Sequence, residues 1–462
     1  MSGLAQDLPD GWWRSSIDAL AEPKGVAYGV LKPGPQVEGG VPMLRVSDVR
    51  DGRVDQSQIY RIGDELDCEY RRTKLRGGEV LVSIQGSVGR AAVVPAELSG
   101  ANVSRTLAMI RLREPELATW VQTALESPQA QHAMRQVVGG TTRDSLNLRD
   151  LRRLEILIAP EPQRSTLLSL IERLRQLNGS SAQHLAAARN AIERFRRAVL
   201  AAACSGYLTA AWREAHPDQC AISELLRDIE GRLSAKRRRV VDGFDASDLS
   251  ELPSTWTWAP LAAVSDSVLG KMLDKAKNKG EPRPYLRNTN VRWRGFDLDD
   301  VSEMRFEAGE EERYGLEPGD VLVCEGGEPG RAAVWRDAES DMRFQKALHR
   351  VRCEGALLPD FLVNVLQAHA YSGMLAGYFT GSGIAHLTGV SLARVPVPLP
   401  PIEEQREIVR RVDQLLALAD SLEQRIDAGS KRVERSSHAV LAKAFRGDLL
   451  PADSASLGQG SS

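Results

Sequence analysis

Cysteine is scarce in this sequence, and the few cysteines lie far apart. Only 5 of the 462 residues are cysteine, and no two form a Cys-x-x-Cys pair, so the spacing predicts neither a zinc clip nor a disulfide framework. No apolar run approaches the roughly 18 residues that a membrane-spanning helix needs. The N-terminus lacks the basic start and apolar core of a signal peptide. We therefore expect a cytoplasmic protein with reduced thiols and no membrane contact.

An excess of one charge is also lacking, because 60 basic residues face 62 acidic ones and the formal net charge is −2. The net charge therefore gives no indication of nucleic-acid binding, and any DNA contact must come from local basic patches or from a partner. The length exceeds what one hydrophobic core usually organises, which indicates two or more domains.

The chain contains an internal duplication. The segment Leu75–Val93 reads LRGGEVLVSIQGSVGRAAV and Leu316–Val334 reads LEPGDVLVCEGGEPGRAAV, so 11 of 19 positions agree at a shift of 241 residues. At the same shift, Arg194–Leu208 agrees with Arg435–Leu449 at 8 of 15 positions. The same shift holds from position 75 to position 208. A period of 241 residues is far too long for a solenoid repeat. The sequence therefore predicts a duplicated unit of one domain and one linker.

Each copy begins with a segment of mixed character. VLVSI and VLVCE follow a Gly-Glu or Gly-Asp pair, which is typical of short buried strands entered from a turn. AAVVP and AAVWR follow the glycine-rich turns GSVGR and GEPGR, and we predict that they are the returning strands. Helical stretches are expected near residues 117–126 and 358–370.

Each copy ends in a long helix with an apolar stripe whose spacing alternates between four and three residues. In the first copy the stripe is Leu167, Ile171, Leu174, Asn178, Ser181, Leu185, Ala188, Ile192, Phe195, Val199 and Ala202. In the second copy it is Ile408, Val412, Leu415, Ala419, Leu422, Ile426, Gly429, Val433, Ser436 and Val440. The polar or small members Asn178, Ser181, Gly429 and Ser436 indicate irregular packing or a place where a partner docks.

The connectivity sets the direction of the two helices, because the second helix must run back along the first to cover its stripe. We predict an α+β fold in which two tandem mixed α/β domains are separated by two long helices. These helices form an antiparallel coiled coil with pseudo-two-fold symmetry. The predicted boundaries are 1–160 for the first domain, 161–208 for the first helix, 209–401 for the linker and second domain, 402–450 for the second helix, and 451–462 for a disordered tail.

The sequence offers no catalytic centre. It has no P-loop and no Asn-Pro-Pro-Tyr or Asp-Pro-Pro-Tyr of the amino-methyltransferases. Asp320 and Glu325 straddle a strand as nuclease carboxylates do, but no lysine is near and Ile84 takes the second acidic position in the other copy. The seven histidines are scattered. We predict that the chain is not an enzyme and holds no metal and no cofactor.

With these features the chain resembles the specificity subunits of Type I restriction-modification systems. The resemblance is carried by the paired LP-x-x-W entries at Leu8 and Leu252, the G-[ED]-V-L-V strands with GR turns, PPIEEQ before a long helix, and AVLAKAFRGDLL at its end. It spans roughly Leu8 to Leu450 and includes the order domain, helix, domain, helix.

The resemblance implies two target-recognition domains, each reading one half of a split double-stranded DNA sequence. It also implies two methyltransferase subunits for N6-adenine methylation and two restriction subunits for ATP-dependent cleavage. S-adenosylmethionine, ATP and Mg²⁺ would then belong to those partners. The alternatives are a stand-alone bipartite DNA-binding regulator and a coiled-coil scaffold for protein interactions.

Several side chains are candidate DNA contacts. Arg45 and Arg287 begin a polar run in equivalent strands and suit a guanine fork, a phosphate contact or an internal salt bridge. Arg90 and Arg331 lie in the GR turns, where their presence in both copies favours phosphate contact or structure over base readout. Arg105 and Lys346 match each other and are predicted phosphate contacts.

Other candidates come from loops. The stretch Lys271–Arg294 holds eight basic and two acidic residues, and this local excess predicts an electrostatic footprint for DNA or a solvated basic loop. Its candidate contacts are Lys271, Lys275, Lys277, Asn288 and Arg292, whereas Trp293 is expected in the core. The polar loops GGTTRDS and GSGIAHL add Thr141, Arg143, Ser382 and His386.

Overall fold

A computed structural model describes residues 8–50, 52–138, 145–217, 222, 226–227, 231, 233–274, 278–381 and 383–449. The chain forms two compact units. Unit 1 comprises Met1–Ala186 and Asp427–Ser462, and unit 2 comprises Ala187–Ile426. Each long helix therefore contributes one half to each unit.

Unit 1 is a mixed domain followed by the first half of a long helix. Its main elements are β1 Trp13–Ser16, α1 Ile17–Leu20, β2 Ala21–Tyr28, β3 Val41–Leu44, η1 Val46–Asp48, β4 Val49–Arg50, β5 Arg53–Val54, β6 Tyr60–Ile62, α2 Asp64–Glu69, β7 Val80–Ser83, β8 Ala91–Val93, β9 Asn102–Val103, β10 Leu107–Leu112, α3 Ala118–Leu125, α4 Pro128–Val137, α5 Leu148–Arg153, β11 Glu155–Ile158 and the start of α6 Glu161–Cys204. Strands VLVSI and AAVVP are thus confirmed as β7 and β8.

Unit 2 repeats this order behind a linker. Its main elements are α7 Ala210–Glu214, α9 Ala235–Asp242, β12 Thr257–Pro260, α10 Leu261–Val264, β13 Ser265–Leu269, β14 Glu281–Leu286, η6 Asn288–Asn290, β15 Val291–Arg292, β16 Gly295–Phe296, β17 Ser302–Phe306, α11 Glu311–Tyr314, β18 Val321–Cys324, β19 Ala332–Val334, β20 Arg343–Phe344, β21 Leu348–Cys353, α12 Pro359–Ser372, η7 Met374–Tyr378, α13 Gly389–Ala393, β22 Pro396–Leu399 and the start of α14 Ile402–Ala444.

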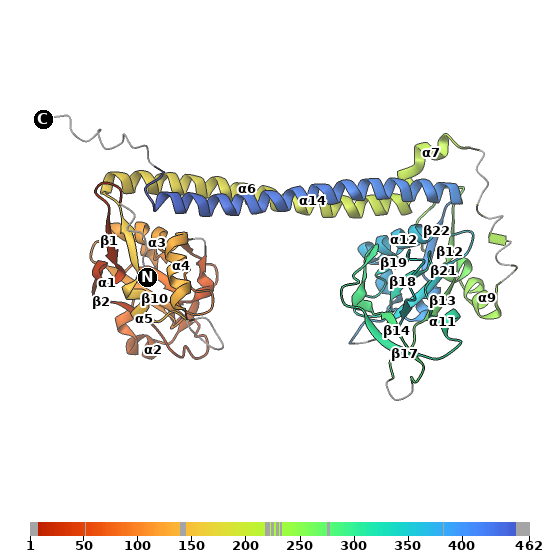
Figure 1. The fold of residues 1–462 in the computed structure, drawn as a ribbon, viewed down its shortest axis with the longest axis horizontal. Coiled ribbons are helices and arrows are strands. Elements are labelled where there is room, and N and C mark those ends of the chain that lie inside the picture. The colour runs from red at the N-terminus through yellow and green to blue at the C-terminus, as the bar shows by residue number, and fades with distance from the viewer. Residues whose placement is uncertain are drawn as a thin grey trace. The chain divides into compact units, whose positions relative to one another are not determined.

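Each unit contains strands and shorter helices beside a stretch of α6 and α14 (Figure 1), and the two units share one strand topology. An antiparallel four-stranded sheet has the order β2-β10-β7-β8 in unit 1 and β13-β21-β18-β19 in unit 2. A three-stranded sheet has the order β6-β3-β9 in unit 1 and β17-β14-β20 in unit 2, and each contains one parallel pairing. The predicted duplication is therefore confirmed at the level of strand order.

The first three residues of strand β7, Val80–Val82, are apolar because two cores flank the strand. Val80 and Val82 lie in the core that contains Leu167 and Ile171 of α6, whereas Leu81 lies in a second core on the other face of the sheet. Strand β18 divides its residues between two cores of unit 2 in the same way. Because the first core includes α6 and α14, burial of apolar surface holds each domain on its helix pair.

Within each unit, α6 and α14 lie side by side in opposite directions. In unit 1, the Asn178 side-chain amide donates to the Ser437 hydroxyl at 2.8 Å, and Leu185 lies over Gly429. In unit 2, Arg196 of α6 pairs with Glu423 of α14 at 2.8 Å, and Arg411 of α14 donates to Leu208 O, just past the end of α6, at 2.7 Å. The residue numbers of these contacts rise along α6 as they fall along α14, so the predicted antiparallel direction is confirmed within each unit.

The predicted stripe is wrong at three positions. Phe195 and Leu422 remain 37% and 38% exposed, and Ser436 is exposed while its neighbour Ser437 makes the seam contact. A strict alternation of four and three drifts from the 3.6 residues per turn of a straight helix. The polar position Asn178 is satisfied by Ser437 inside the pair, which explains its place in the seam without a docked partner.

The end of each long helix packs against the beginning of a domain. In unit 1, Gly447 adopts a φ of +79° and lies against Pro9; in unit 2, Gly206 adopts a φ of +82° and lies against Pro253. A side chain at either glycine would have to displace the proline ring, and its backbone would be strained. The same glycine–proline contact therefore occurs in both units. In unit 1 it joins the two ends of the sequence, and in unit 2 it joins segments about 50 residues apart.

Ion pairs recur at the shift of 241 residues. Arg53 pairs with Glu172 of α6 in unit 1, and Arg294 pairs with Asp413 of α14 in unit 2. Inside the sheets, Arg111 pairs with Glu79 and Arg352 pairs with Asp320. The last contact places the Asp320 carboxylate in an ion pair inside the sheet of unit 2.

Among the described residues, no helix has the length and apolar character to cross a membrane. The described cysteines Cys68, Cys204, Cys324 and Cys353 are free thiols. Cys220 and the predicted tail 451–462 lie outside the described residues.

The buried carboxylate of Glu404 anchors the linker in unit 2. It is 1% exposed and accepts hydrogen bonds from Thr209 at 2.7 Å and the Trp256 indole at 2.9 Å, and Arg213 pairs with it. The equivalent residue of unit 1 is the neutral Gln163, whose side-chain oxygen accepts from the Trp12 indole at 2.7 Å. This position therefore carries a charge in unit 2, where Arg213 pairs with it, and a neutral amide in unit 1.

Arg213→Ala should leave the Glu404 carboxylate buried without its cation, which costs about 3 kcal/mol. We expect the melting temperature of unit 2 to fall by roughly 6–12 °C. Thermal unfolding monitored by circular dichroism measures this change. Adding Glu404→Gln should recover most of this loss, because glutamine serves at the same position in unit 1. Equal destabilisation of the single and double variants would contradict this explanation.

Candidate nucleic-acid interface

Loops from several parts of the chain meet at one end of the central strands β7 and β10 of the unit 1 sheet. The end of β7 is held on both sides, because the Ile84 amide donates to Thr106 O and the Leu146 amide donates to Ile84 O, each at 2.9 Å. The Arg105 amide donates to Val30 O at 2.9 Å. We call residues 29–31, 45–50, 84–90, 104–106 and 145–146 loop surface 1.

Unit 2 has equivalent contacts at the corresponding end of strands β18 and β21. The Glu325 amide donates to Ala347 O at 2.9 Å, the Leu387 amide donates to Glu325 O at 2.8 Å, and the Lys346 amide donates to Lys271 O at 2.7 Å. Residues 270–272, 287–292, 325–331, 345–347 and 383–387 form loop surface 2. The structure therefore gathers most of the candidate contacts at equivalent places in the two units.

Three predicted cations are exposed on these surfaces. Arg105, Lys346 and Arg90 are exposed, and none of their side chains has a hydrogen-bond or ion-pair partner among the residues that the structure describes. Arg105 and Lys346 occupy equivalent positions beside the glycine turns. An exposed cation without an internal partner is free to contact a phosphate.

Arg45 and Arg287 are instead engaged inside their domains. The Arg45 guanidinium lies 4.9 Å from the centre of the Tyr60 ring and 3.7 Å from the Asp48 carboxylate. Arg287 pairs with the Asp300 carboxylate at 2.7 Å. The sequence leaves a guanine fork, a phosphate contact or an internal salt bridge open for Arg45 and Arg287. Their observed contacts fit the internal salt bridge.

The basic stretch Lys271–Arg294 is largely neutralised by acidic side chains. Five of its cations form ion pairs: Lys271 with Glu307 and Glu310, Arg283 with Asp341, Arg287 with Asp300, Arg292 with Asp297, and Arg294 with Asp413. The acids come from other parts of unit 2. Of the six basic residues of this stretch that the structure describes, five are therefore ion-paired and Lys279 is exposed.

Lys271 is the clearest correction, because its side chain is buried. Burial acts to lower the pKa of Lys271, but hydrogen bonds to Glu307 and Glu310 outweigh it and raise the pKa. The Lys271 ammonium is thus paired with two carboxylates inside unit 2. The prediction that Lys271 contacts DNA is therefore wrong.

The glycine turn of unit 2 binds its own neighbours. Arg331 pairs with Glu328 at 2.6 Å and donates to Asn288 O at 2.9 Å, and the Asn288 amide donates to Gly326 O at 3.2 Å. Trp293 packs against the core, as predicted, and its indole donates to Glu328 at 3.1 Å. Arg331 and Asn288 therefore shape loop surface 2.

Of the polar-loop candidates, only His386 is described. It is exposed, its backbone pairs with Thr380, and its ring lies over Gly326. Thr141, Arg143, Lys275, Lys277 and Ser382 lie outside the described residues.

His349 is a positioning residue that the sequence analysis did not find. Its Nε2 lies 2.9 Å from Leu387 O and holds the end of the loop that carries His386. Burial lowers the pKa of His349, so that the neutral ring is favoured. Ala108 stands at the equivalent position of unit 1, and its methyl side chain cannot make this hydrogen bond. Comparing the two copies therefore gives no signal for the role of His349.

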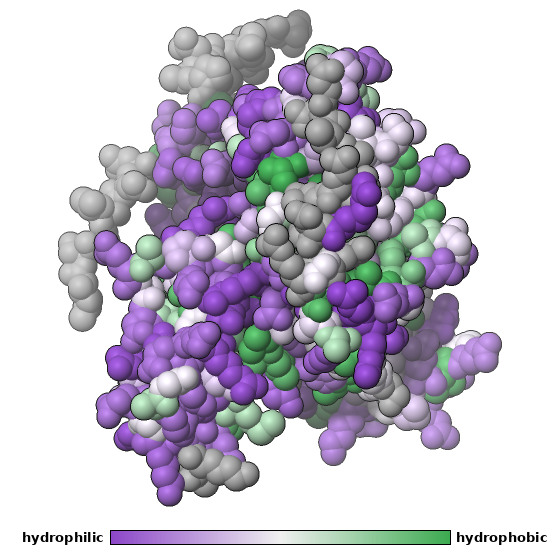
Figure 2. Space-filling view, turned by 90° about the vertical axis from the view of Figure 1, so that its right-hand side faces the viewer, coloured by the Kyte–Doolittle hydropathy of each residue, from purple (hydrophilic) through white to green (hydrophobic). Residues whose placement is uncertain are grey.

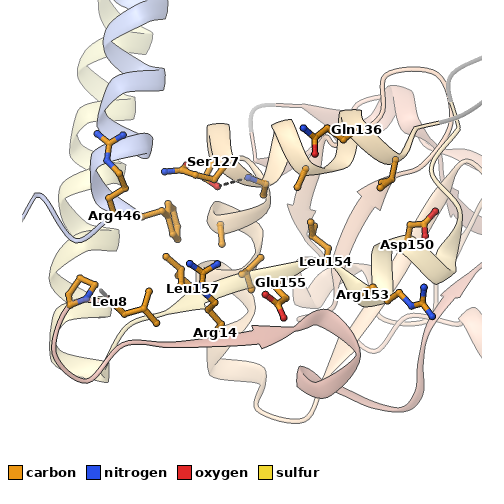
Figure 3. A pocket seen from close by; sticks show the side chains of 18 residues that line it. Leu8, Arg14, Ser127, Gln136, Asp150, Arg153, Leu154, Glu155, Leu157 and Arg446 are labelled. Carbon is orange, nitrogen blue, oxygen red and sulfur yellow. Dashed lines mark hydrogen bonds between the residues drawn. The ribbon is translucent and has the colours of Figure 1, made fainter. Parts of the chain in front are cut away.

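A cavity of about 870 Å³ in unit 1 lies between β1, β11, α4 and the end of α14 (Figure 3). Arg14, Arg153 and Glu155 line it, and the Ser127 hydroxyl caps α4 by accepting from the Ala130 amide at 3.3 Å. The described residues contain no group of three metal-ligating side chains. The cavity lining shows no nucleophile held by a base, so the loop surfaces remain the candidate functional site.

A protein-family model described as the Type I restriction modification DNA specificity domain matches residues 253–429. The match covers most of the domain of unit 2 and the first part of α14. The specificity subunit of the Type I restriction enzyme EcoKI, from Escherichia coli (strain K12), is 22% identical across 96% of this chain and 90% of that protein. The EcoBI subunit of Escherichia coli is 28% identical, over 46% of this chain and 45% of that protein.

Solved structures share the fold. A chain from a study of complex assembly and conformational transition in the type I R-M system has a TM-score of 0.65 at 20% identity, covering 96% of this chain and 100% of that chain. The HsdS subunit from Thermoanaerobacter tengcongensis has a TM-score of 0.53 at 19% identity, covering 97% of this chain and 100% of that chain.

The matched family model is a DNA specificity domain, and the solved structures share the fold over nearly the whole chain. The chain is similar to the specificity subunits of Type I restriction-modification systems, and its residues 253–429 match their DNA specificity domain. Both the family model and the relatives are named for DNA specificity.

Replacing Arg105 and Lys346 by alanine should weaken DNA binding through the loss of two phosphate contacts. Each contact contributes about 0.9 to the slope of log Kobs against log salt, so we expect the slope to become shallower by roughly 1.8. Fluorescence anisotropy with a labelled duplex over a series of salt concentrations measures this. Lys236→Ala, on the exposed face of α9, is the matched control. An unchanged slope in the double variant would remove both residues from the interface.

Proposed function

We propose that this chain is the sequence-reading component of a Type I restriction-modification complex. Loop surface 1 reads one half of a split duplex target and loop surface 2 reads the other half. The observation that carries the proposal is the recurrence of an exposed cation, Arg105 or Lys346, at equivalent places on both surfaces, without a side-chain partner among the described residues. Phosphate contacts from these cations would orient each domain on DNA before its bases are read.

The two surfaces differ where base readout is expected. The short helix η1 presents Val46–Asp48 where η6 presents Asn288–Asn290, and the glycine turns carry Ser87–Val88 in one unit and Glu328–Pro329 in the other. A shared frame with different loop side chains suits two half-sites that are not copies of each other. The bases are read by hydrogen bonds and apolar contacts with their groove edges.

The proposal assigns catalysis to partner chains. Two methyltransferase subunits would dock on this subunit and methylate adenine N6 in each half-site, and two restriction subunits would cleave DNA. S-adenosylmethionine, ATP and Mg²⁺ would be bound by those partners. The complex would work in the cytoplasm, where the host DNA lies. The similarity to a chain from a study of complex assembly in the type I R-M system supports this arrangement.

Sequencing of modified bases in host DNA tests the function directly. Deleting the gene should abolish N6-methyladenine at one split motif, and complementation with the wild-type gene should restore it. Methylation that is unchanged by the deletion would contradict the proposal. In that case, specific binding to a split duplex without methyltransferase co-purification would favour a stand-alone regulator, and the absence of any DNA binding would favour a protein-interaction scaffold.

A further inference from the structure

Two large apolar side chains are exposed at equivalent positions of the loop surfaces. Leu31 of unit 1 is 45% exposed and Met272 of unit 2 is 60% exposed, and they lie 241 residues apart, at the shift of the duplication. The face of the protein in Figure 2 is mostly hydrophilic, with hydrophobic residues in small patches. A single exposed leucine needs no explanation, but the same exposure in both copies does.

Both side chains are placed by a close backbone approach that requires glycine. A Cβ on Gly29 would lie 1.7 Å from Val103 O, and a Cβ on Gly270 would lie 2.2 Å from Gln345 O. This approach lets the following segment pair with the strand beside it, through the bridges Val30–Ser104 and Lys271–Gln345. The position of the apolar residue is therefore built into both copies.

The residue before each exposed side chain is anchored inward. Val30 is fully buried, and Lys271 is buried between Glu307 and Glu310. These two anchors have opposite chemistry, yet both leave the next residue exposed. The carbonyls of Val30 and Lys271 also accept from the amides of Arg105 and Lys346. Each exposed apolar residue thus follows a residue whose backbone is bonded to that of an exposed cation.

If Arg105 and Lys346 contact phosphates, as the proposed function requires, the apolar residue beside each cation would lie close to a groove of the duplex. In the major groove, the apolar feature on a base edge is the 5-methyl group of thymine. If adenine is methylated in both half-sites, as the proposed function requires, each half contains at least one A·T pair and hence one such methyl group. A target feature common to both halves matches an apolar residue common to both units.

We propose that Leu31 and Met272 are specificity-determining residues, each contacting a thymine methyl group in the half-site that its unit reads. The inference rests on the proposed function and adds to it the chemical group that is read. Leucine and methionine both suit the contact, because each presents an unbranched Cβ and a flexible apolar end to the methyl group.

The test uses the full chain in complex with its methyltransferase and a duplex carrying the split target. Each thymine is replaced in turn by uracil, which removes only the methyl group, and the dissociation constant is measured. One replacement in one half should weaken wild-type binding by about fourfold, the gain expected for burying one methyl group. In Leu31→Ala the same replacement should have no effect, and Met272→Ala should show the same coupling in the other half.

Tyr207→Ala provides a matched control, because Tyr207 is an exposed apolar residue of the linker; its response to uracil should equal that of the wild type. The exchanges Leu31→Met and Met272→Leu should keep the coupling, which guards against a general loss of structure in the alanine variants. Uracil effects that persist in the alanine variants would overturn the inference, as would equal weakening of target and non-target duplexes. A wild-type complex with no preference for its target would instead refute the proposed function.

Discussion

The burial of the apolar faces of α6 and α14 is the constraint on which the rest of the structure depends. Neither helix can leave a stripe that includes Leu167, Ile192, Val412 and Ile426 in water, and in each unit the half of one helix covers the half of the other. The same helices complete the domain cores, since Leu167 and Val412 belong to the clusters that contain β7 and β18. The helix pair and the domain of each unit therefore share one apolar core.

The duplication separates what holds the protein together from what distinguishes its halves. Strand order, the glycine–proline closures and the ion pairs Arg53–Glu172 and Arg294–Asp413 recur in both units. The loop surfaces keep the same frame but change its side chains, as Val46 and Asn288 illustrate. A repeated scaffold with variable loops suits a protein whose two halves face different DNA sequences.

The repeat, the strands and the two long helices could be predicted because their signals are local and periodic. The state of each cation could not, because its partner comes from a distant segment without periodicity. Lys271 is the clearest case, since nothing near it in the sequence marks Glu307 and Glu310 as its partners. Comparing charges at the shift of 241 residues would have found the pair Arg294–Asp413, whose counterparts in the first copy carry the same charges.

Under the proposed function two reading units are joined by paired helices, and we propose that the length of these helices sets the gap between the half-sites of the DNA target. Adding one heptad after Ser180 in α6 and one after Glu434 in α14 keeps the seam of unit 1 in register and lengthens both helices by about 10 Å. Modified-base sequencing should then show the same two half-sites separated by a gap about three base pairs longer. Methylation at the original gap, or a change in the bases of either half-site, would contradict the account.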